Sequence, residues 1–440
     1  MSMQVPRGGR AGTAAAVALA ALAGGSAGAA ESLQQAWAMA LGRDPGLAAV
    51  AADADAAEAR ARAARAARLP SLEANAAYTR YDAAPALEVN SGSFAFRSPR
   101  IFDNDDTVMA GARLSLPVYA GGSLVAGATA AGEASRAAQA GQRQAAADLR
   151  LDVATHYVGV LRARRALLAA EAAVTSLESH VSDVAVMVDR ESVAASDLLA
   201  ARVALANVRQ QRLRAANAVE LAHAAYNRRL GQPLDRVPDL EDRLVGAPLE
   251  PAERRLDELL AAALANREEL GILDAQAASF QAQARAERGR LRPQLALTAG
   301  YDHLETTILD REDFASIGLG LRWTLFDGGQ VRQRAQALRR QGDAARLRQE
   351  DLRTLVELQV REAWLGVGEA DARGVVAREA VSQADENLRI SRELYGAGLV
   401  THTQVLDAIT LRVAAVNNRD DAQFDAELAR LRLARASGSL

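Results

Sequence analysis

The sequence predicts an α+β membrane protein of two structural repeats, built mainly of long α-helices with four strands per chain. Three observations predict it: an internal duplication, proline-free stretches that suit very long helices, and short segments of alternating apolar residues. Identical or similar residues recur at a constant offset, first 223 and then 207 positions later. Leu33, Leu41, Leu47, Pro70, Leu72 and Tyr78 match Leu256, Leu264, Leu270, Pro293, Leu295 and Tyr301; Val118, Tyr119, Gly121, Gly122, Leu149, Val153, Tyr157 and Val160 match Leu325, Phe326, Gly328, Gly329, Val356, Val360, Trp364 and Val367.

The offset falls by 16 between the first and the second set of matches, so the two repeats differ in length between these sets. Segment 79–115 is longer than its counterpart, 302–322. Length freedom of this kind is typical of solvent-exposed loops, so we expect a loop there.

Residues 1–30 have the features of a signal peptide. Arg7 and Arg10 form a basic region, an Ala/Leu/Val stretch follows, and Ala27 and Ala29 have the spacing of a cleavage site. We therefore expect the mature chain to leave the cytoplasm. The chain contains no cysteine, so we expect no lipid-modified N-terminal cysteine. A net charge of −3 gives no support for nucleic-acid binding.

The order of elements is the same in both repeats: helix, β-hairpin, long helix, helix. Pro45 is expected to break or kink the first helix. Residues 231–253, which contain four prolines, are expected to form a linker in the equatorial region. The first repeat, 31–230, is expected to contain a helix to Arg68, a hairpin at 71–119 and helices at 122–190 and 196–230. The second repeat, 254–437, is expected to contain a helix, a hairpin at 294–326 and helices at 329–396 and 402–437.

The long helix of the first repeat would be far longer than ordinary globular helices. No proline occurs between about Gly122 and Asp189, a stretch that would span about 100 Å at roughly 1.5 Å per residue. Leu149, Val153, Tyr157 and Val160 follow one another at helical spacing and predict a narrow seam of the coiled-coil type.

Alternating residues predict two strands in each repeat. In the clearest case, Ile317, Leu319 and Leu321 alternate with glycine and arginine. Strands of about ten residues fit the length of tilted transmembrane strands. Four strands cannot close a barrel, and each unpaired backbone group at an edge in lipid costs several kcal/mol. The chain must then oligomerise; the alternative is a half-buried sheet in water, which alternation also permits.

Several motifs in both repeats resemble the TolC family of outer membrane efflux proteins. Pro70 and Pro293 precede the first strand of each hairpin, and glycine pairs follow the second strand, in 116–122 and 323–329. Tyr395-Gly396-Ala397-Gly398 precedes Val405-Leu406-Asp407-Ala408. The resemblance extends from about Glu31 to Leu433.

The resemblance implies a homotrimer in the outer membrane. Its twelve strands would form one β-barrel, continued by a hollow α-helical barrel through the periplasm. Such channels are not enzymes and need no cofactor or metal. They are the exit ducts of tripartite efflux or type I secretion systems, passive for small molecules or polypeptides. Expected partners are outer membrane lipid, a periplasmic adaptor (membrane fusion) protein and an inner-membrane pump of the RND, ABC or MFS type. The barrel-to-helix junctions are expected at Pro70, Pro293, Gly121, Gly122, Gly328 and Gly329.

The resemblance also implies a periplasmic gate at the turns between each long helix and the helix that follows. Tyr395 matches the family's tyrosine, Asp407 matches one of its pore carboxylates, and Asp197 matches the aspartate of the first repeat. The arginine position falls at Val400 and a further aspartate position at Gln404, so the closing network is expected to be altered. Threefold symmetry would turn Asp407 or Asp197 into a ring of carboxylates that favours cations.

Simpler interpretations exist for these residues. Asp197 would be favoured in the first turn of a helix by the helix dipole alone. Gln404 has capping-box spacing from Thr401. Gly398 suits a helix C-terminus, but its counterpart in the first repeat is Glu191, so the two turns are expected to differ.

Two other classes of protein are alternatives to the channel. An enzyme is disfavoured because the five histidines lie far apart in sequence and no phosphate loop or serine elbow occurs. A periplasmic helical adaptor or scaffold protein of an export system is the closer alternative. An adaptor should have one helical hairpin flanked by compact β-domains, so the duplication favours the channel.

Overall fold

The computed structural model describes residues 30–83, 86–91, 94–100, 105–242, 255–305 and 310–440. Nearly all of the signal peptide predicted at 1–30 and part of the linker predicted at 231–253 lie outside these residues. The first repeat contains α1 (Leu33–Arg43), α2 (Pro45–Ala66), β1 (Ser71–Arg80), β2 (Ala86–Ser91), β3 (Phe94–Arg100), β4 (Asp106–Ala120), α3 (Ser123–Asp189) and α4 (Ala195–Arg229). The second contains α5 (Leu256–Asn266), α6 (Glu268–Gly289), β5 (Gln294–Leu304), β6 (Asp313–Arg322), α7 (Gln330–Gly396) and α8 (His402–Ser437).

Pro45 breaks the first helix, as expected. Asp44 is the C-cap of α1 and the N-cap of α2, and its side chain accepts a hydrogen bond of 2.8 Å from the Leu47 N–H. Proline fits at the start of a helix because its missing N–H would have no partner there. The second repeat has the same break, between α5 and α6 at Arg267.

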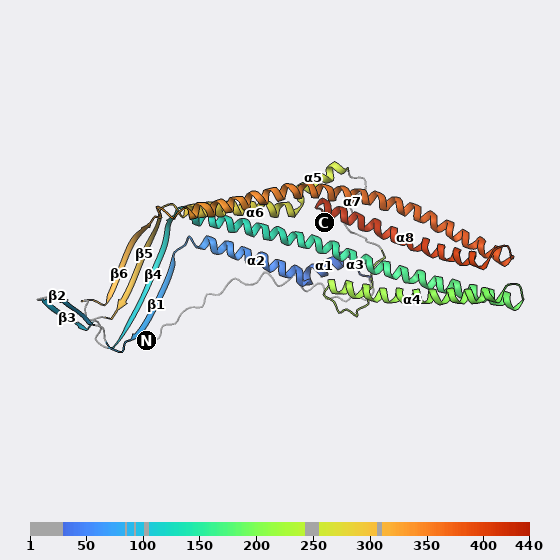
Figure 1. Ribbon diagram of the computed structural model, residues 1–440, viewed down its shortest axis with the longest axis horizontal. Coiled ribbons are helices and arrows are strands. Elements are labelled where there is room, and N and C mark those ends of the chain that lie inside the picture. The colour runs from blue at the N-terminus through green and yellow to red at the C-terminus, as the bar shows by residue number, and fades with distance from the viewer. Residues whose placement is uncertain (1–29, 84–85, 92–93, 101–104, 243–254, 306–309) are drawn as a thin grey trace, which may run out of the picture.

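Two helices of 67 residues, α3 and α7, run the length of the helical part (Figure 1). At about 1.5 Å per residue each is about 100 Å long. The shorter helices α1, α2 and α4 pack along α3, while α5, α6 and α8 pack along α7. The repeats join because α3 also packs against α6 and α8.

The predicted apolar seam is confirmed. Val153, Tyr157 and Val160 of α3 are fully buried, and Leu149 is 8 % exposed. Their counterparts Val356, Val360 and Val367 are buried on α7, whereas Trp364 is only partly buried. The two helices therefore use the same face of the duplicated sequence for packing.

One antiparallel sheet contains strands of both repeats, in the order β1-β4-β5-β6. A tyrosine at the end of each hairpin donates a hydrogen bond of 2.9 Å to an aspartate on the next strand: Tyr78 to Asp106, and Tyr301 to Asp313. These pairs occupy equivalent positions in the two repeats. The outer strands, β1 and β6, have no partner strand beyond them among the described residues.

The register gives the sheet one apolar and one polar face, since residues opposite one another share a face. One row across the strands is Leu72, Leu114, Ala299 and Ile317; the next row on the other face is Glu73, Arg113, Gly300 and Ser316. Within the protomer the apolar face is uncovered, with Leu72 73 % and Ile317 80 % exposed.

The expectation of a loop over 79–115 is wrong in part. Strand β4 begins at Asp106, and β2 and β3 form a separate antiparallel pair before it (Figure 1). The extra length of the first repeat therefore forms a second, small hairpin. Sequence 86–100 contains Val89, Phe94 and Phe96, residue types that suit strands.

Among the helices of the described residues, none contains a segment both long and apolar enough to cross a membrane.

Candidate functional site

The junctions between sheet and helices use the predicted prolines and glycines. Pro70 lies directly before β1 and Pro293 directly before β5. The paired glycines lead from strand to long helix: Gly121 and Gly122 have φ of 64° and 82°, and Gly328 and Gly329 have φ of 66° and 86°. Side chains rarely adopt such positive values, which explains two successive glycines at each place.

Gly121 has a second constraint that Gly328 lacks. A Cβ on Gly121 would lie 2.1 Å from the carbonyl oxygen of Gly289, the last residue of α6, whereas one on Gly328 would meet nothing within 4 Å. At the second junction Asp327 instead accepts hydrogen bonds from the backbone of Gly329 and Val331 at 2.9 and 2.8 Å.

At the opposite end, the helical tip consists of the turns α3–α4 and α7–α8. In the second turn, the Gly398 N–H donates to Tyr395 and the Leu399 N–H to Leu394, both at 2.9 Å. This pattern is the Schellman motif, with Gly398 at φ 73°. In the first turn, the Glu191 N–H donates to Val188 and that of Ser192 to Met187, again at 2.9 Å.

The expectation that the two turns differ is therefore wrong for the backbone. Glu191 adopts φ 57°, the one non-glycine residue with positive φ in the described part of the chain. The duplicated helix geometry imposes the same turn on both repeats, although only one of them has glycine at the position that favours it.

The predicted gate residues occupy different environments at the tip. Tyr395 of α7 is buried, with 6 % exposed. Asp197 lies half-buried in the first turn of α4. Asp407 and Gln404 are exposed on α8. No capping box forms, since Thr401 makes no side-chain cap and the Gln404 backbone N–H donates to the Thr401 carbonyl at 3.1 Å.

Two histidines that sequence reasoning treated as scattered meet beside Tyr395. His180 of α3 and His402 of α8, 222 positions apart, have parallel rings with centroids 4.9 Å apart. Nε2 of His180 lies 3.1 Å from Nδ1 of His402. The Tyr395 ring centroid is 5.7 Å from that of His180 and 6.0 Å from that of His402.

Burial governs the protonation of this group. The two histidines are only 4 and 5 % exposed. Burial lowers the pKa of His180 to about 4, and the charges of His402 and Arg392 act in the same direction. Burial also lowers the pKa of His402, against the opposing effect of Asp197. Burial, and then Asp197, raises the pKa of Tyr395. At neutral pH the group is therefore uncharged.

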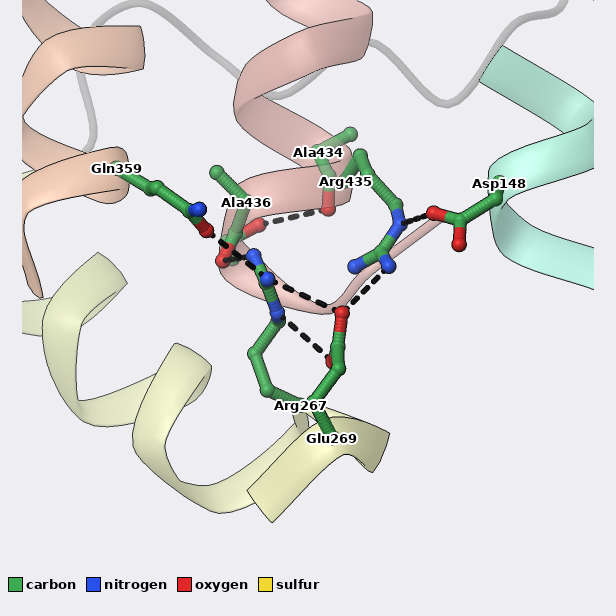
Figure 2. Close-up of polar contacts among 8 residues, drawn as sticks. Asp148, Arg267, Glu269, Gln359, Ala434, Arg435 and Ala436 are labelled. Carbon is green, nitrogen blue, oxygen red and sulfur yellow. Dashed lines mark hydrogen bonds and ion pairs between the residues drawn. The ribbon is translucent and has the colours of Figure 1, made fainter. Parts of the chain in front are cut away.

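A polar network at mid-length ties the repeats together (Figure 2). Arg435, near the end of α8, donates from Nε to Asp148 of α3 at 2.7 Å and from Nη2 to Glu269 of α6 at 2.6 Å. Arg267 donates to Glu269 and also reaches Gln359 of α7 at 3.0 Å. Four helices thus meet through two arginines.

Glu269 is the carboxylate that both arginines share. Burial alone raises the pKa of its carboxyl, but the hydrogen bonds from Arg435, from its own backbone and from Arg267 outweigh burial and lower it. The ionised form is therefore the one that the fold stabilises.

The described residues contain no cluster of three or more histidine, cysteine, aspartate or glutamate side chains arranged to hold a metal ion. The residues gathered at the junctions, the tip and the mid-length network position helices. No nucleophile with an activating base is among them.

Comparisons with known proteins agree with this arrangement. A sequence model of the outer membrane efflux protein family matches residues 37–232 and 259–439. No curated protein matches the chain in sequence.

Solved structures share the fold at low identity. CusC, described as forming a transmembrane channel, is similar with a TM-score of 0.80 and 17 % identity over 93 % of this chain and 92 % of that one. The outer membrane protein VceC of Vibrio cholerae has a TM-score of 0.78 and 19 % identity over 92 % and 96 %. The outer membrane channel CmeC of Campylobacter jejuni has a TM-score of 0.77 and 15 % identity, over 92 % of this chain and 85 % of that one.

The family match spans both repeats and excludes the adaptor alternative, and the family is one of transporters without enzymatic activity. The chain therefore belongs to the outer membrane efflux protein family, as an efflux channel of the outer membrane with a periplasmic helical extension.

Proposed function

We propose that three copies of this chain close into a ring that serves as a passive exit duct. The proposal rests on the outer edges of β1 and β6, which have no partner strand within the described part of the protomer. Unpaired backbone groups at a sheet edge cannot stay in lipid. Pairing β6 of one protomer with β1 of the next is a head-to-tail contact. Repeated contacts of this kind form a closed ring when the rotation between neighbouring protomers divides a full turn. Three is the number implied by the resemblance to the TolC family.

The helices support the same closure. Helix α2 leads into β1, and β6 leads into α7. In the protomer α2 packs on α3, and α7 packs on α6, so α2 and α7 end the helical layer at the same two sides as the open strands. A ring of twelve strands would then continue directly into a ring of helices.

The two faces of the sheet fit lipid outside and water inside. Leu72, Ile317 and Leu319 are exposed on the apolar face of the protomer. Glu73, Arg113 and Asp302 lie on the other face by register. A barrel with its apolar face outward would bury the first set in the membrane and line a polar channel with the second.

The partners follow from the same proposal. The duct would receive its cargo, small molecules or polypeptides, from an inner-membrane pump of the RND, ABC or MFS type through a periplasmic adaptor protein. The residues of this chain favour none of these pump classes over the others.

The periplasmic tip is the proposed gate. Asp407 is exposed near the start of α8, and threefold symmetry would repeat it as a ring of carboxylates at a narrow opening. Such a ring attracts cations and repels anions. Gln404 precedes it by one helical turn, while Asp197 and Tyr395 lie at the contact between the hairpins α3–α4 and α7–α8.

Ion selectivity in planar bilayers tests this proposal. The purified protein is expected to conduct, and Asp407→Ala should reduce its preference for cations, measured as the reversal potential in a KCl gradient. Asp257→Ala, on α5 at mid-length with a side chain 80 % exposed, removes the same charge away from the tip and should leave selectivity unchanged. A protein that does not conduct would contradict the channel; unchanged selectivity in Asp407→Ala would contradict its role at the opening.

A further inference from the structure

The contact between His180 and His402 joins two helical hairpins that lie far apart in the sequence. His180 belongs to the α3–α4 hairpin and His402 to α7–α8. Near this level, Arg392 of α7 also donates a hydrogen bond of 2.5 Å to the Ser176 hydroxyl of α3, across the same two hairpins. Among the described residues, few polar contacts therefore hold the two hairpins together at the tip.

The geometry of the pair does not allow both rings to be charged. The two nitrogens face each other at 3.1 Å, so one must carry a proton and the other must accept it. Doubly protonated rings would present two donors to each other. In addition, Nε2 of His402 and the Tyr395 hydroxyl are buried without a hydrogen-bond partner among the described residues. A proton added to this group therefore places a charge where none of these atoms can stabilise it.

The surrounding charges do not offset that cost. Asp183 of α3 favours a charged His180 and Asp197 of α4 favours a charged His402, but neither forms an ion pair or hydrogen bond with a ring within the described structure. Arg392 of α7 opposes the charge on His180, as does His402 itself.

We propose that His180 and His402 form an acid-sensitive latch between the two hairpins of each protomer, and that protonation releases α7–α8 from α3 at the periplasmic tip. The inference rests on the proposed function in one respect: release of the latch widens the duct only if the tip is its gate.

The direction of the pH dependence follows from linkage. The pKa of His180 is about 4 in the closed tip against 6.5 for an ordinary histidine. The closed tip has its full stability above pH 6.5 and loses it as the pH falls from there towards 4. With these two values, a fall from pH 7.5 to 5 shifts the equilibrium towards the released tip by about 30-fold.

Spin labels at the tip measure this release. The chain has no cysteine, so Leu399→Cys, at a position 72 % exposed, introduces a single site per protomer. Distances between labels are compared at pH 7.5 and 5, together with conductance, in the purified assembly with chelator present. The test variants are His180→Gln with His402→Gln, and His180→Gln alone in case the double variant does not assemble, since glutamine is polar but does not titrate.

His223→Gln is the matched control. His223 is as buried as His180, at 4 % exposed, and its pKa is also lowered by burial, but it packs beside Arg164 near the other end of α4. We expect longer distances between the labels and higher conductance at pH 5 than at pH 7.5 in the Leu399→Cys protein, with or without His223→Gln. The acid response should be much smaller when His180→Gln is present, alone or with His402→Gln.

Each result has a distinct meaning. An assembly that conducts but shows no acid response, or keeps its full response in the glutamine variants, would overturn the latch and leave the channel intact. A protein that neither assembles nor conducts at pH 7.5 would overturn the proposed function instead. Loss of the response in His223→Gln alone would place the titrating group outside the tip and would also overturn the latch.

Discussion

Glu191 adopts a backbone conformation at the tip that its counterpart, Gly398, adopts without strain. Both residues complete Schellman turns with the same hydrogen bonds, yet only Glu191 carries a side chain at positive φ. The left-handed conformation costs a non-glycine residue roughly 1–2 kcal/mol. The first turn is therefore the less stable of the two by residue type alone.

Exchanging the residue types at these positions should shift local stability in opposite directions. Glu191→Gly removes the strain and should slow hydrogen exchange of the amides of the first turn. The free energy of local opening at these amides should rise by up to about 1 kcal/mol. Gly398→Ala introduces strain and should speed exchange in the second turn by a similar amount. Mass-spectrometric hydrogen exchange on the assembled protein measures both. Equal exchange in Glu191→Gly and wild type would mean that the turn at Glu191 is not strained.

At the scale of elements, the network around Arg435 determines how α8 ends against α3 and α6 (Figure 2). The side chains of Arg435 and Glu269 are 13 and 15 % exposed, so neither is well solvated. Removing one partner of such a pair leaves the other charge buried without compensation. The network matters more for the fit of the helices than surface ion pairs do, because exposed pairs contribute little.

Arg435→Gln should lower stability by about 2–4 kcal/mol, measured as a fall in the midpoint of thermal or denaturant unfolding. Arg432→Gln, exposed on the same helix and three residues away, is the control and should change the midpoint little. Because the pKa of Glu269 is lowered, the contribution of the network is present above its ordinary value of 4.5 and is lost as the pH falls below it. The difference in unfolding midpoint between wild type and Arg435→Gln should therefore become smaller in acid. A gap that is constant with pH would assign the effect to packing.

Most elements could be predicted from sequence because each depends on a local pattern that the second repeat confirms. The break at Pro45, the seam through Val153 and Tyr157, and the glycine pairs at the junctions all follow from local chemistry. The strands β2 and β3 had no counterpart in the second repeat, so the duplication offered no support for them.

The tip was less predictable for a different reason. His180 and His402 meet only because α3 and α8 pack side by side, a contact between hairpins that no periodicity within either helix reveals. The backbone of the Glu191 turn was missed because residue type argued against it, whereas helix geometry determined the outcome.

At the scale of the whole molecule, strands and helices are arranged in the same order. The sheet runs β1-β4-β5-β6, and the helices joined to these strands, α2, α3, α6 and α7, pack in the corresponding order. Sheet and helical layer therefore end together at both sides (Figure 1), as a segment of the proposed ring would. In the proposed ring, further copies of the chain supply the neighbouring strands of β1 and β6.

The native mass of the protein extracted by detergent from the outer membrane shows whether this ring forms, with the soluble periplasmic fraction analysed beside it. We expect an assembly of three protomers in the membrane fraction, after subtraction of bound detergent. A soluble monomer or dimer would contradict it, because the edges of β1 and β6 and the apolar face between them would then be exposed to water.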